Sequence, residues 1–279
     1  MSVVAVGSVR SCGASTLALG LAATWPSSRR LVLVEADPAG GTLAGASGWP
    51  PEPSLVSLAA AARHGGSPEM VFDHCQALPG GAAVVVAPAS AEQSRATLAM
   101  AERLLGRLGE LDADVVVDCG RLDPGSPALA VVAGADRLVV AVRPRLADLH
   151  TAATWLEARP LAQVPVALVA VGDGPYPDAE IAEALGVEVA ARLAWDPAAA
   201  EALVSVPASA RRLRMAPLTR AVRTLAEHLA AGATGEPVAG AASSSARGRA
   251  RLGRRMLAPW RAEPAVASTN ASASNGATQ

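Results

Sequence analysis

The sequence predicts an α/β protein whose doubly wound, mainly parallel sheet has about seven strands, with helices on both faces. Short β-branched runs recur along the chain, and each is followed by turn residues and then by a stretch rich in Ala and Leu. Most of these runs are continuously apolar, which is typical of strands covered on both faces. Strands that alternate with helices indicate right-handed βαβ crossovers and therefore a parallel sheet.

The positions of the elements follow from this periodicity. The predicted strands are Val3–Val6, Leu31–Val34, Ala83–Val86, Val115–Val117, Leu138–Val142, Val166–Val171 and Val187–Leu193. The clearest predicted helices are Ser15–Thr24, Ala91–Leu111, Leu146–Ala158, Asp178–Leu185 and Leu213–Ala231. Pro26 ends the first helix, because proline lacks the N–H that a continuing helix needs.

The composition predicts one large domain and a tail. The chain has 279 residues, of which 51% are hydrophobic and 18% are charged, and we expect a globular domain over residues 1–231. Residues 232–279 are rich in Gly, Ala, Ser and Thr, so a low-complexity, disordered tail is expected there. No apolar run approaches the ~18 residues of a membrane span. Arg10 interrupts the apolar amino terminus, so we expect a cytoplasmic protein without a signal peptide.

The three cysteines, Cys12, Cys75 and Cys119, have no metal-like spacing, and reduced thiols are expected. Cys12 and Cys119 both lie at ends of central strands. They are either small buried side chains or a redox pair.

A basic segment lies within the predicted tail. Residues 246–261 carry six arginines and no acid, and Leu252, Met256 and Trp260 recur at four-residue spacing. This pattern predicts a short amphipathic helix at a membrane surface. Two glycines and Pro259 weaken such a helix, so the alternative is a disordered segment in weak contact with an anionic membrane or nucleic acid.

The segment after the first predicted strand, Gly7–Thr16, has the features of an anion-binding loop. Small side chains allow successive backbone N–H groups to surround an anion, and the amino end of the helix that begins at Ser15 faces the same point. The small residues are Ser8, Ser11, Gly13 and Ala14. The alternative is an ordinary tight turn in which Ser15 and Thr16 only cap the helix.

This loop lacks the cation that a phosphate loop normally carries. Such a loop places a lysine after its last glycine and then a Ser or Thr hydroxyl for Mg²⁺. Ser15 supplies the hydroxyl, but Ala14 stands where the lysine is required. All 24 basic residues of the chain are arginines.

Two further strand ends carry acids. The second predicted strand leads into Glu35, Asp37 and a glycine-rich turn, and the fourth ends at Asp118. Asp118 stands where a carboxylate can hold a Mg²⁺-linked water. A lone aspartate at a strand end more often forms a turn. Here, however, the ends of the first, second and fourth predicted strands all carry residues suited to phosphate or Mg²⁺, and this favours a binding site.

Over residues 1–230 these motifs resemble the MinD/ParA family of partition and septum-positioning ATPases, including the CpaE/TadZ type found in pilus-assembly loci. In that family the loop resembles KGGxGK[ST]T, the second strand leads into DxDPQG, and the Walker B strand ends in Asp. Pro175-Tyr176-Pro177 and the segment Leu193–Pro197 are similar to later family segments, the second to its "IPxD" stretch. The resemblance implies a P-loop NTPase-like fold with ATP or ADP and Mg²⁺ as cofactors.

The resemblance also implies roles for individual residues. Asp37 matches the acid that positions the attacking water, and Ser15 and Asp118 match the Mg²⁺ site. Glu35 matches the acid that precedes Asp37. The implied nucleotide-binding residues are Ser8, Arg10, Ser11, Gly13, Ala14, Ser15, Thr16, Asp173 and Asp196, the last two at the adenine.

Both family lysines are absent, because Val9 and Ala14 occupy their positions. Loss of one key donor to a transition state costs roughly 10²–10³ in rate. We therefore expect a scaffold or localisation factor in chromosome partition, septum positioning or pilus/secretion assembly, with weak or no ATP turnover. It would act through protein partners and as a homodimer, in the cytoplasm or peripherally at the membrane.

The alternative is a slow ATPase in which an arginine replaces the lysine, with Arg10, Arg143 or Arg145 as the replacement. These arginines can equally be solvated surface charges. A small-molecule enzyme is a third class, but the sequence contains no grouping of a nucleophile with a base.

Overall fold

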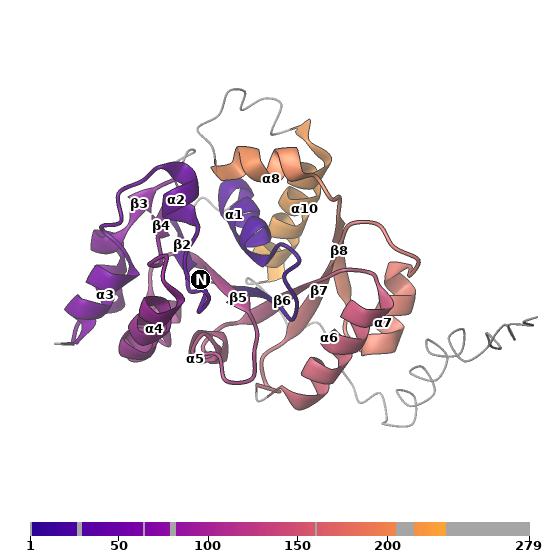
Figure 1. The fold of residues 1–279 in the computed structure, drawn as a ribbon, viewed down its shortest axis with the longest axis horizontal. Coiled ribbons are helices and arrows are strands. Elements are labelled where there is room, and N and C mark those ends of the chain that lie inside the picture. The colour runs from indigo at the N-terminus through magenta and orange to yellow at the C-terminus, as the bar shows by residue number, and fades with distance from the viewer. Residues whose placement is uncertain are drawn as a thin grey trace, which may run out of the picture. The chain divides into compact units, whose positions relative to one another are not determined.

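The computed structural model describes residues 2–26, 30–63, 65–78, 82–159, 161–204 and 215–232. They form one sheet with the strand order β3-β4-β2-β5-β1-β6-β7-β8 (Figure 1). The strands are β1 (Val3–Ser8), β2 (Leu31–Glu35), β3 (Gln76–Ala77), β4 (Ala83–Val85), β5 (Asp114–Arg121), β6 (Arg137–Val142), β7 (Val166–Val171) and β8 (Val189–Leu193). Every neighbouring pair is parallel except β3 with β4. The prediction of a mainly parallel sheet is confirmed.

The central strands bring three chain segments to one edge of the sheet. All of β1 is buried, and β5 is buried up to its last residue, Arg121. The register places Val6 of β1 and Glu35 of β2 on either side of Asp118 in β5. Because parallel strands end at the same edge, the loops that follow β1, β2 and β5 meet there.

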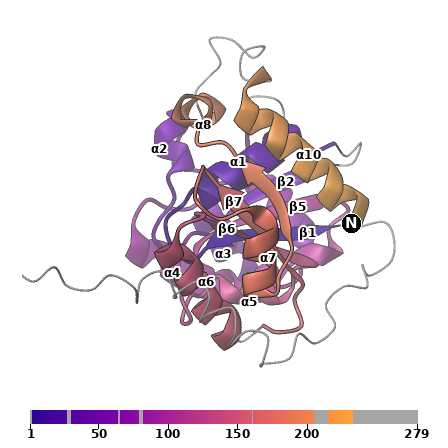
Figure 2. The ribbon, with the colours of Figure 1, turned by 90° about the vertical axis from the view of Figure 1, so that its right-hand side faces the viewer.

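Helices cover both faces of the sheet. The helices are α1 (Ala14–Thr24), α2 (Leu43–Ser47), α3 (Leu55–Ala62), α4 (Ala91–Leu105), α5 (Leu129–Ala133), α6 (Leu146–Ala158), α7 (Asp178–Leu185), α8 (Pro197–Val204) and α10 (Pro217–Gly232), with 3-10 helices η1 (Pro68–His74) and η2 (Leu108–Glu110). Helices α1, α8 and α10 lie on one face, and α4, α5 and α6 lie on the other (Figures 1 and 2). Leu17 and Leu21 of α1 share a buried core with Val222 and Leu225 of α10. The doubly wound arrangement is thus confirmed.

Some predicted boundaries are wrong for local reasons. The helix predicted at Ala91–Leu111 ends at Leu105, because the chain turns at Gly106 and continues only as the short η2. Helix α8 was not predicted, although Asp196 followed by Pro197 is a common start signal. Helix α3 was not predicted either, and it begins with a capping box between Ser54 and Ser57.

The predicted tail, residues 232–279, lies outside the described residues apart from Gly232 in α10. The basic segment 246–261 falls there as well, so the domain boundary and the role of that segment remain predictions. In the part of the chain that the structure describes, no helix is long and apolar enough to cross a bilayer.

Candidate functional site

The loop between β1 and α1 turns into the helix at Gly13. This residue has a φ of 96°, in the left-handed region that glycine adopts without strain. A Cβ at this position would meet nothing within 4 Å, so the loop faces open space here. Helix α1 begins at Ala14, one residue before the predicted start. The predicted strand–loop–helix unit is therefore present.

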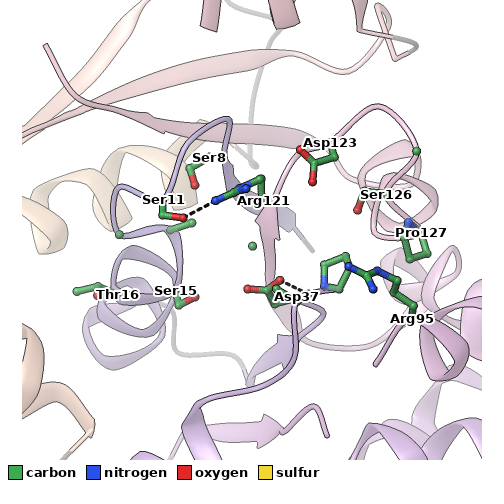
Figure 3. A pocket seen from close by; sticks show the side chains of 16 residues that line it. Ser8, Ser11, Ser15, Thr16, Asp37, Arg95, Arg121, Asp123, Ser126 and Pro127 are labelled. Atoms are coloured by element: carbon green, nitrogen blue, oxygen red, sulfur yellow. Dashed lines mark hydrogen bonds between the residues drawn. The ribbon is translucent and has the colours of Figure 1, made fainter. Parts of the chain in front are cut away.

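The loop forms one wall of a cleft of about 590 Å³, a volume in the range of ligand pockets. The other walls come from the turn after β2, the segment after β5, and one residue of α4 (Figure 3). The lining residues are Ser8, Ser11, Gly13, Ala14, Ser15, Thr16, Asp37, Pro38, Ala39, Arg95, Gly120, Arg121, Asp123, Gly125, Ser126 and Pro127. The structure thus gathers most of the predicted loop residues and Asp37 around one space.

Asp118 lies at the base of this region and is 1% exposed. Its carboxylate accepts a hydrogen bond from the backbone N–H of Gly120 at 3.0 Å, and the Ser15 hydroxyl lies near enough to lower its pKa. Burial nevertheless raises the pKa of Asp118 to about 7; Ser15 and the Gly120 N–H oppose the rise, and the charges of Glu35 and Asp37 add to it. A hydroxyl paired with a carboxylate suits Mg²⁺.

Among the described residues, no group of three or more His, Cys, Asp and Glu side chains could hold a metal ion. Magnesium is usually bound through one or two carboxylates together with waters and phosphate oxygens. Ser15 and Asp118 therefore fit a magnesium ion that arrives with a phosphate ligand, and they do not make a protein-only metal site.

Asp37 stands on the wall that faces Ser15 (Figure 3). Its carboxylate accepts a hydrogen bond from the N–H of Ala39 at 2.8 Å, and its backbone carbonyl accepts one from the Ser94 hydroxyl at 2.6 Å. The carboxylate also packs against the backbone of Gly120, where a Cβ would overlap it. Gly120 has a φ of 57°, so the close approach and the backbone conformation both require glycine.

Glu35 has a structural role and does not line the cleft. It is 1% exposed, and its carboxylate accepts from the N–H groups of Thr42, Leu43 and Ala87 at 2.7, 3.1 and 2.9 Å. Burial raises the pKa of Glu35, and the three N–H donors oppose the rise. Through these hydrogen bonds, Glu35 links the chain on either side of the Asp37 turn to the segment that follows β4.

The arginines proposed from the sequence to replace the lysine do not line the cleft. Arg10 points toward α6, where its Nε donates to the Thr151 hydroxyl at 3.2 Å and lies 3.5 Å from the Asp148 carboxylate. Arg143 lies over the Trp195 ring at 5.2 Å from the centroid and donates to the Ser11 carbonyl at 3.4 Å. Arg10 and Arg143 border a separate hollow on the outer side of the loop.

Two other arginines line the cleft, and the sequence reasoning missed both. Arg121 ends β5, three residues after Asp118, and its guanidinium donates to the Ser11 hydroxyl at 2.8 Å (Figure 3). Arg95 belongs to α4 and is exposed at the far wall. The sequence did contain a signal for Arg121, because this residue follows Asp118 closely at the end of the same strand and therefore lies at the same edge of the sheet.

A smaller apolar pocket of about 270 Å³ adjoins the loop and shares Gly13 and Thr16 with the cleft. Trp195 and Asp196 belong to its lining, and the Asp196 carboxylate accepts from the N–H of Ala199, which caps α8. Asp173 is exposed and is not among the lining residues. Of the two residues expected at the adenine, the structure therefore brings only Asp196 beside the loop.

The fold of this chain recurs in solved structures. The ParA family ATPase from Chlorobium tepidum TLS superposes with a TM-score of 0.68 at 18% identity, over 82% of this chain and 98% of that one. The septum site-determining protein MinD from Pyrococcus horikoshii OT3, complexed with Mg-ADP, gives 0.67 at 14% identity, over 85% and 99%. The chain has the fold of the ParA and MinD ATPases.

The same fold also carries other activities. Cobyrinic acid a,c-diamide synthase from Mycobacterium smegmatis, with bound ADP and magnesium, superposes with a TM-score of 0.54 at 20% identity, over 82% of this chain and 94% of that one. No protein-family model and no curated protein sequence matches the chain. The fold narrows the function without deciding it.

Ala14 and Val9, which the family resemblance aligns with two lysines, border different hollows. Ala14 is 5% exposed and lines the cleft. Val9 borders the outer hollow together with Arg10, Arg121 and Arg143. The loop therefore contributes no cation to the cleft, while its outer surface is rich in arginine.

The cysteines are buried or partly buried free thiols. The Cys12 thiol donates to the carbonyl of Ala141 at 3.0 Å. Burial raises the pKa of Cys12 to about 11 and also raises the pKa of Cys119. A thiol with a raised pKa is a poor nucleophile, which favours the interpretation of Cys12 and Cys119 as small buried side chains.

Proposed function

We propose that this protein is a MinD/ParA-like positioning protein that binds ADP or ATP with Mg²⁺ in the cleft and hydrolyses ATP slowly or not at all. One observation carries the proposal. The cleft keeps the Ser15–Asp118 pair and the facing Asp37, but Ala14 stands where the loop would need an ammonium group. Such a protein acts as a scaffold or localisation factor in chromosome partition, septum positioning or pilus/secretion assembly.

The chemistry of the site supports binding more strongly than turnover. Ser15 and Asp118 would hold the magnesium ion, which neutralises phosphate charge when it is bound. Phosphoryl transfer depends on positioning and on charge stabilisation at the transferred group. Without the loop lysine, the cleft lacks a donor whose loss costs roughly 10²–10³ in rate.

Solved structures with this fold support the ligand and the mode of action. MinD from Pyrococcus horikoshii is complexed with Mg-ADP, and MinD from Aquifex aeolicus forms a complex with MinC. By analogy, this protein would bind a magnesium-bound adenine nucleotide and transmit its state to protein partners. A homodimer and a cytoplasmic or peripheral membrane location belong to the same proposal.

The alternative function is a slow ATPase that uses an arginine in place of the lysine. The observation that favours it is that Arg121 and Arg95 line the cleft. In that alternative Asp37 positions the attacking water, so turnover depends on the Asp37 carboxylate.

The test combines calorimetric titration of the full chain with Mg-ADP and Mg-ATP and an assay of phosphate release. We expect both nucleotides to bind, with phosphate release no faster than that of Asp37→Asn. Phosphate release clearly faster in wild type than in Asp37→Asn, even at a slow rate, would reject the scaffold and favour the slow ATPase. If neither nucleotide binds, the nucleotide part of the proposal fails.

A further inference from the structure

We infer that Arg121, at the strand end beside the loop, is the residue that recognises the phosphate groups of the ligand. This inference rests on the proposed function, since it assigns the cation for the same cleft. It is distinct from the sequence-based hypothesis, which placed that role on Arg10, Arg143 or Arg145.

The fold places Arg121 beside the loop. The register of the central strands pairs Arg121 of β5 with Ser8 of β1, so the Arg121 side chain leaves the sheet next to the loop. Figure 3 shows this side chain reaching from the end of β5 toward Ser11. Arg121 borders both the cleft and the hollow on the outer side of the loop.

The charge of Arg121 is not neutralised by the protein. Within the described part of the chain it makes no ion pair, and the partner of its guanidinium is the neutral Ser11 hydroxyl. Other arginines are paired: Arg10 with Asp148, and Arg192 with Asp178. An arginine that is bonded only to a hydroxyl keeps its charge available for an anion.

The cleft needs such a cation. Asp37 and Asp123 line it and Asp118 lies beneath it, so the acids alone would repel a phosphate. Arg121 and Arg95 are the two arginines among the lining residues. Arg121 is the one next to the loop, whereas Arg95 stands on α4 at the far wall.

It is chemically favourable for the Arg121 guanidinium to exchange the Ser11 hydroxyl for a phosphate oxygen as its acceptor. A phosphate oxygen is a charged acceptor, and hydrogen bonds from guanidinium to phosphate are stronger than those to a neutral hydroxyl. The planar guanidinium can also donate two parallel hydrogen bonds, which a lysine cannot do. A phosphate ligand in the cleft would therefore draw Arg121 away from Ser11.

The experiment titrates the full chain with Mg-ADP and with inorganic pyrophosphate in wild type, Arg121→Ala, Arg121→Lys and Arg63→Ala. Arg63 is an exposed arginine at the end of α3, outside the cleft. We expect Arg121→Ala to weaken both ligands about 10- to 100-fold, as loss of a charged hydrogen-bond donor does. Arg121→Lys should recover part of the loss, and Arg63→Ala should bind like wild type. The melting temperature of each ligand-free variant is measured in parallel.

The outcomes separate this inference from the function on which it rests. If Arg121→Ala binds Mg-ADP as tightly as wild type, the inference is overturned and the proposed function stands. If wild type binds neither ligand, both are overturned. If Arg121→Lys binds no better than Arg121→Ala and both melt at a lower temperature than wild type, Arg121 only holds Ser11 in place, and the inference is overturned.

Discussion

The two walls of the cleft differ in charge, although both are built from segments that follow strands of the same sheet. The wall formed by the β1–α1 loop consists of small neutral residues, and its first helical residue is Ala14. The wall formed by the turn after β2 and the segment after β5 carries the charges of Asp37, Arg121 and Asp123. In this protein the β1–α1 loop lines the cleft with small neutral residues, whereas the charged side chains come from the other segments.

The largest expected effect comes from placing a cation on the loop wall. Ala14→Lys places an ammonium group at the start of α1, and we expect phosphate release from Mg-ATP to rise about 10²- to 10³-fold. Ala39→Lys is the matched control, because it adds the same charge at an exposed position on the facing wall. Equal rates in the two variants, or no rise in a folded Ala14→Lys protein, would contradict the hypothesis that position 14 is where the cleft lacks its phosphate donor.

The next effect concerns the glycine that shapes the facing wall. Gly120→Ala forces a Cβ into the Asp37 carboxylate and into a left-handed backbone conformation. We expect the free energy of unfolding to fall by about 2 kcal/mol or more, measured by urea denaturation.

Gly125→Ala is the control for this prediction. Gly125 lines the same cleft, its φ is not positive, and a Cβ there would meet nothing within 4 Å. It should unfold like wild type or slightly later, because alanine loses less backbone freedom than glycine. Equal stability of Gly120→Ala and Gly125→Ala would show that the Gly120 backbone can relax.

A third prediction concerns Glu35, which holds the wall that carries Asp37. In Glu35→Gln an amide N–H₂ must face at least one of the three N–H donors, so one donor loses its acceptor. We expect a loss of about 1–3 kcal/mol in the free energy of unfolding. Glu102→Gln, on the exposed surface of α4, serves as the control and should change little.

The pH dependence of Glu35→Gln sharpens this prediction. Burial raises the pKa of Glu35 above its ordinary value of 4.5, so the folded protein retains a proton that the unfolded chain loses first. Stability therefore falls as the pH rises from 4.5 to the raised pKa, and is constant above it. Glu35→Gln removes this part of the slope, while Asp118 contributes a slope of the same sign up to about pH 7. Urea denaturation of wild type and Glu35→Gln between pH 4.5 and 8 measures how the free energy of unfolding changes with pH. If this pH dependence is the same in the two proteins, the pKa of Glu35 is not raised by folding.

The smallest effect is expected at the far wall. Arg95 is exposed on α4, where water and salt screen its charge. Arg95→Ala should weaken Mg-ADP about two- to fivefold at low salt and have less effect at high salt. Calorimetric titration at two salt concentrations tests this, and a loss as large as that of Arg121→Ala would mean that the far wall holds the phosphates.

Local patterns in the sequence were sufficient to predict most elements of the fold. Continuous β-branched runs predicted the seven parallel strands, because a strand covered on both faces must be apolar throughout. The two-residue β3 carries no such pattern and exists through its pairing with β4. The start of α1 was predicted to within one residue, because a glycine and small residues mark the loop before it.

The candidate site was predicted less completely. Ser15, Asp37 and Asp118 each follow or end a predicted parallel strand. Because the carboxyl ends of parallel strands meet at one edge of the sheet, the sequence predicted that these residues lie together. The direction of long, flexible arginine side chains does not follow from such a pattern. Arg10 was expected in the cleft because it lies within the loop, but the Asp148 carboxylate on α6 holds it outside.

By itself, the sequence determined the parallel sheet, the small-residue loop after the first strand and the absence of any lysine from the chain. These are matters of residue type and local periodicity. Only the tertiary structure decided that Glu35 is enclosed by three N–H groups and that Arg121 is the arginine beside the loop. Both depend on which loops meet at one edge of the sheet, and therefore on contacts between residues far apart in the chain.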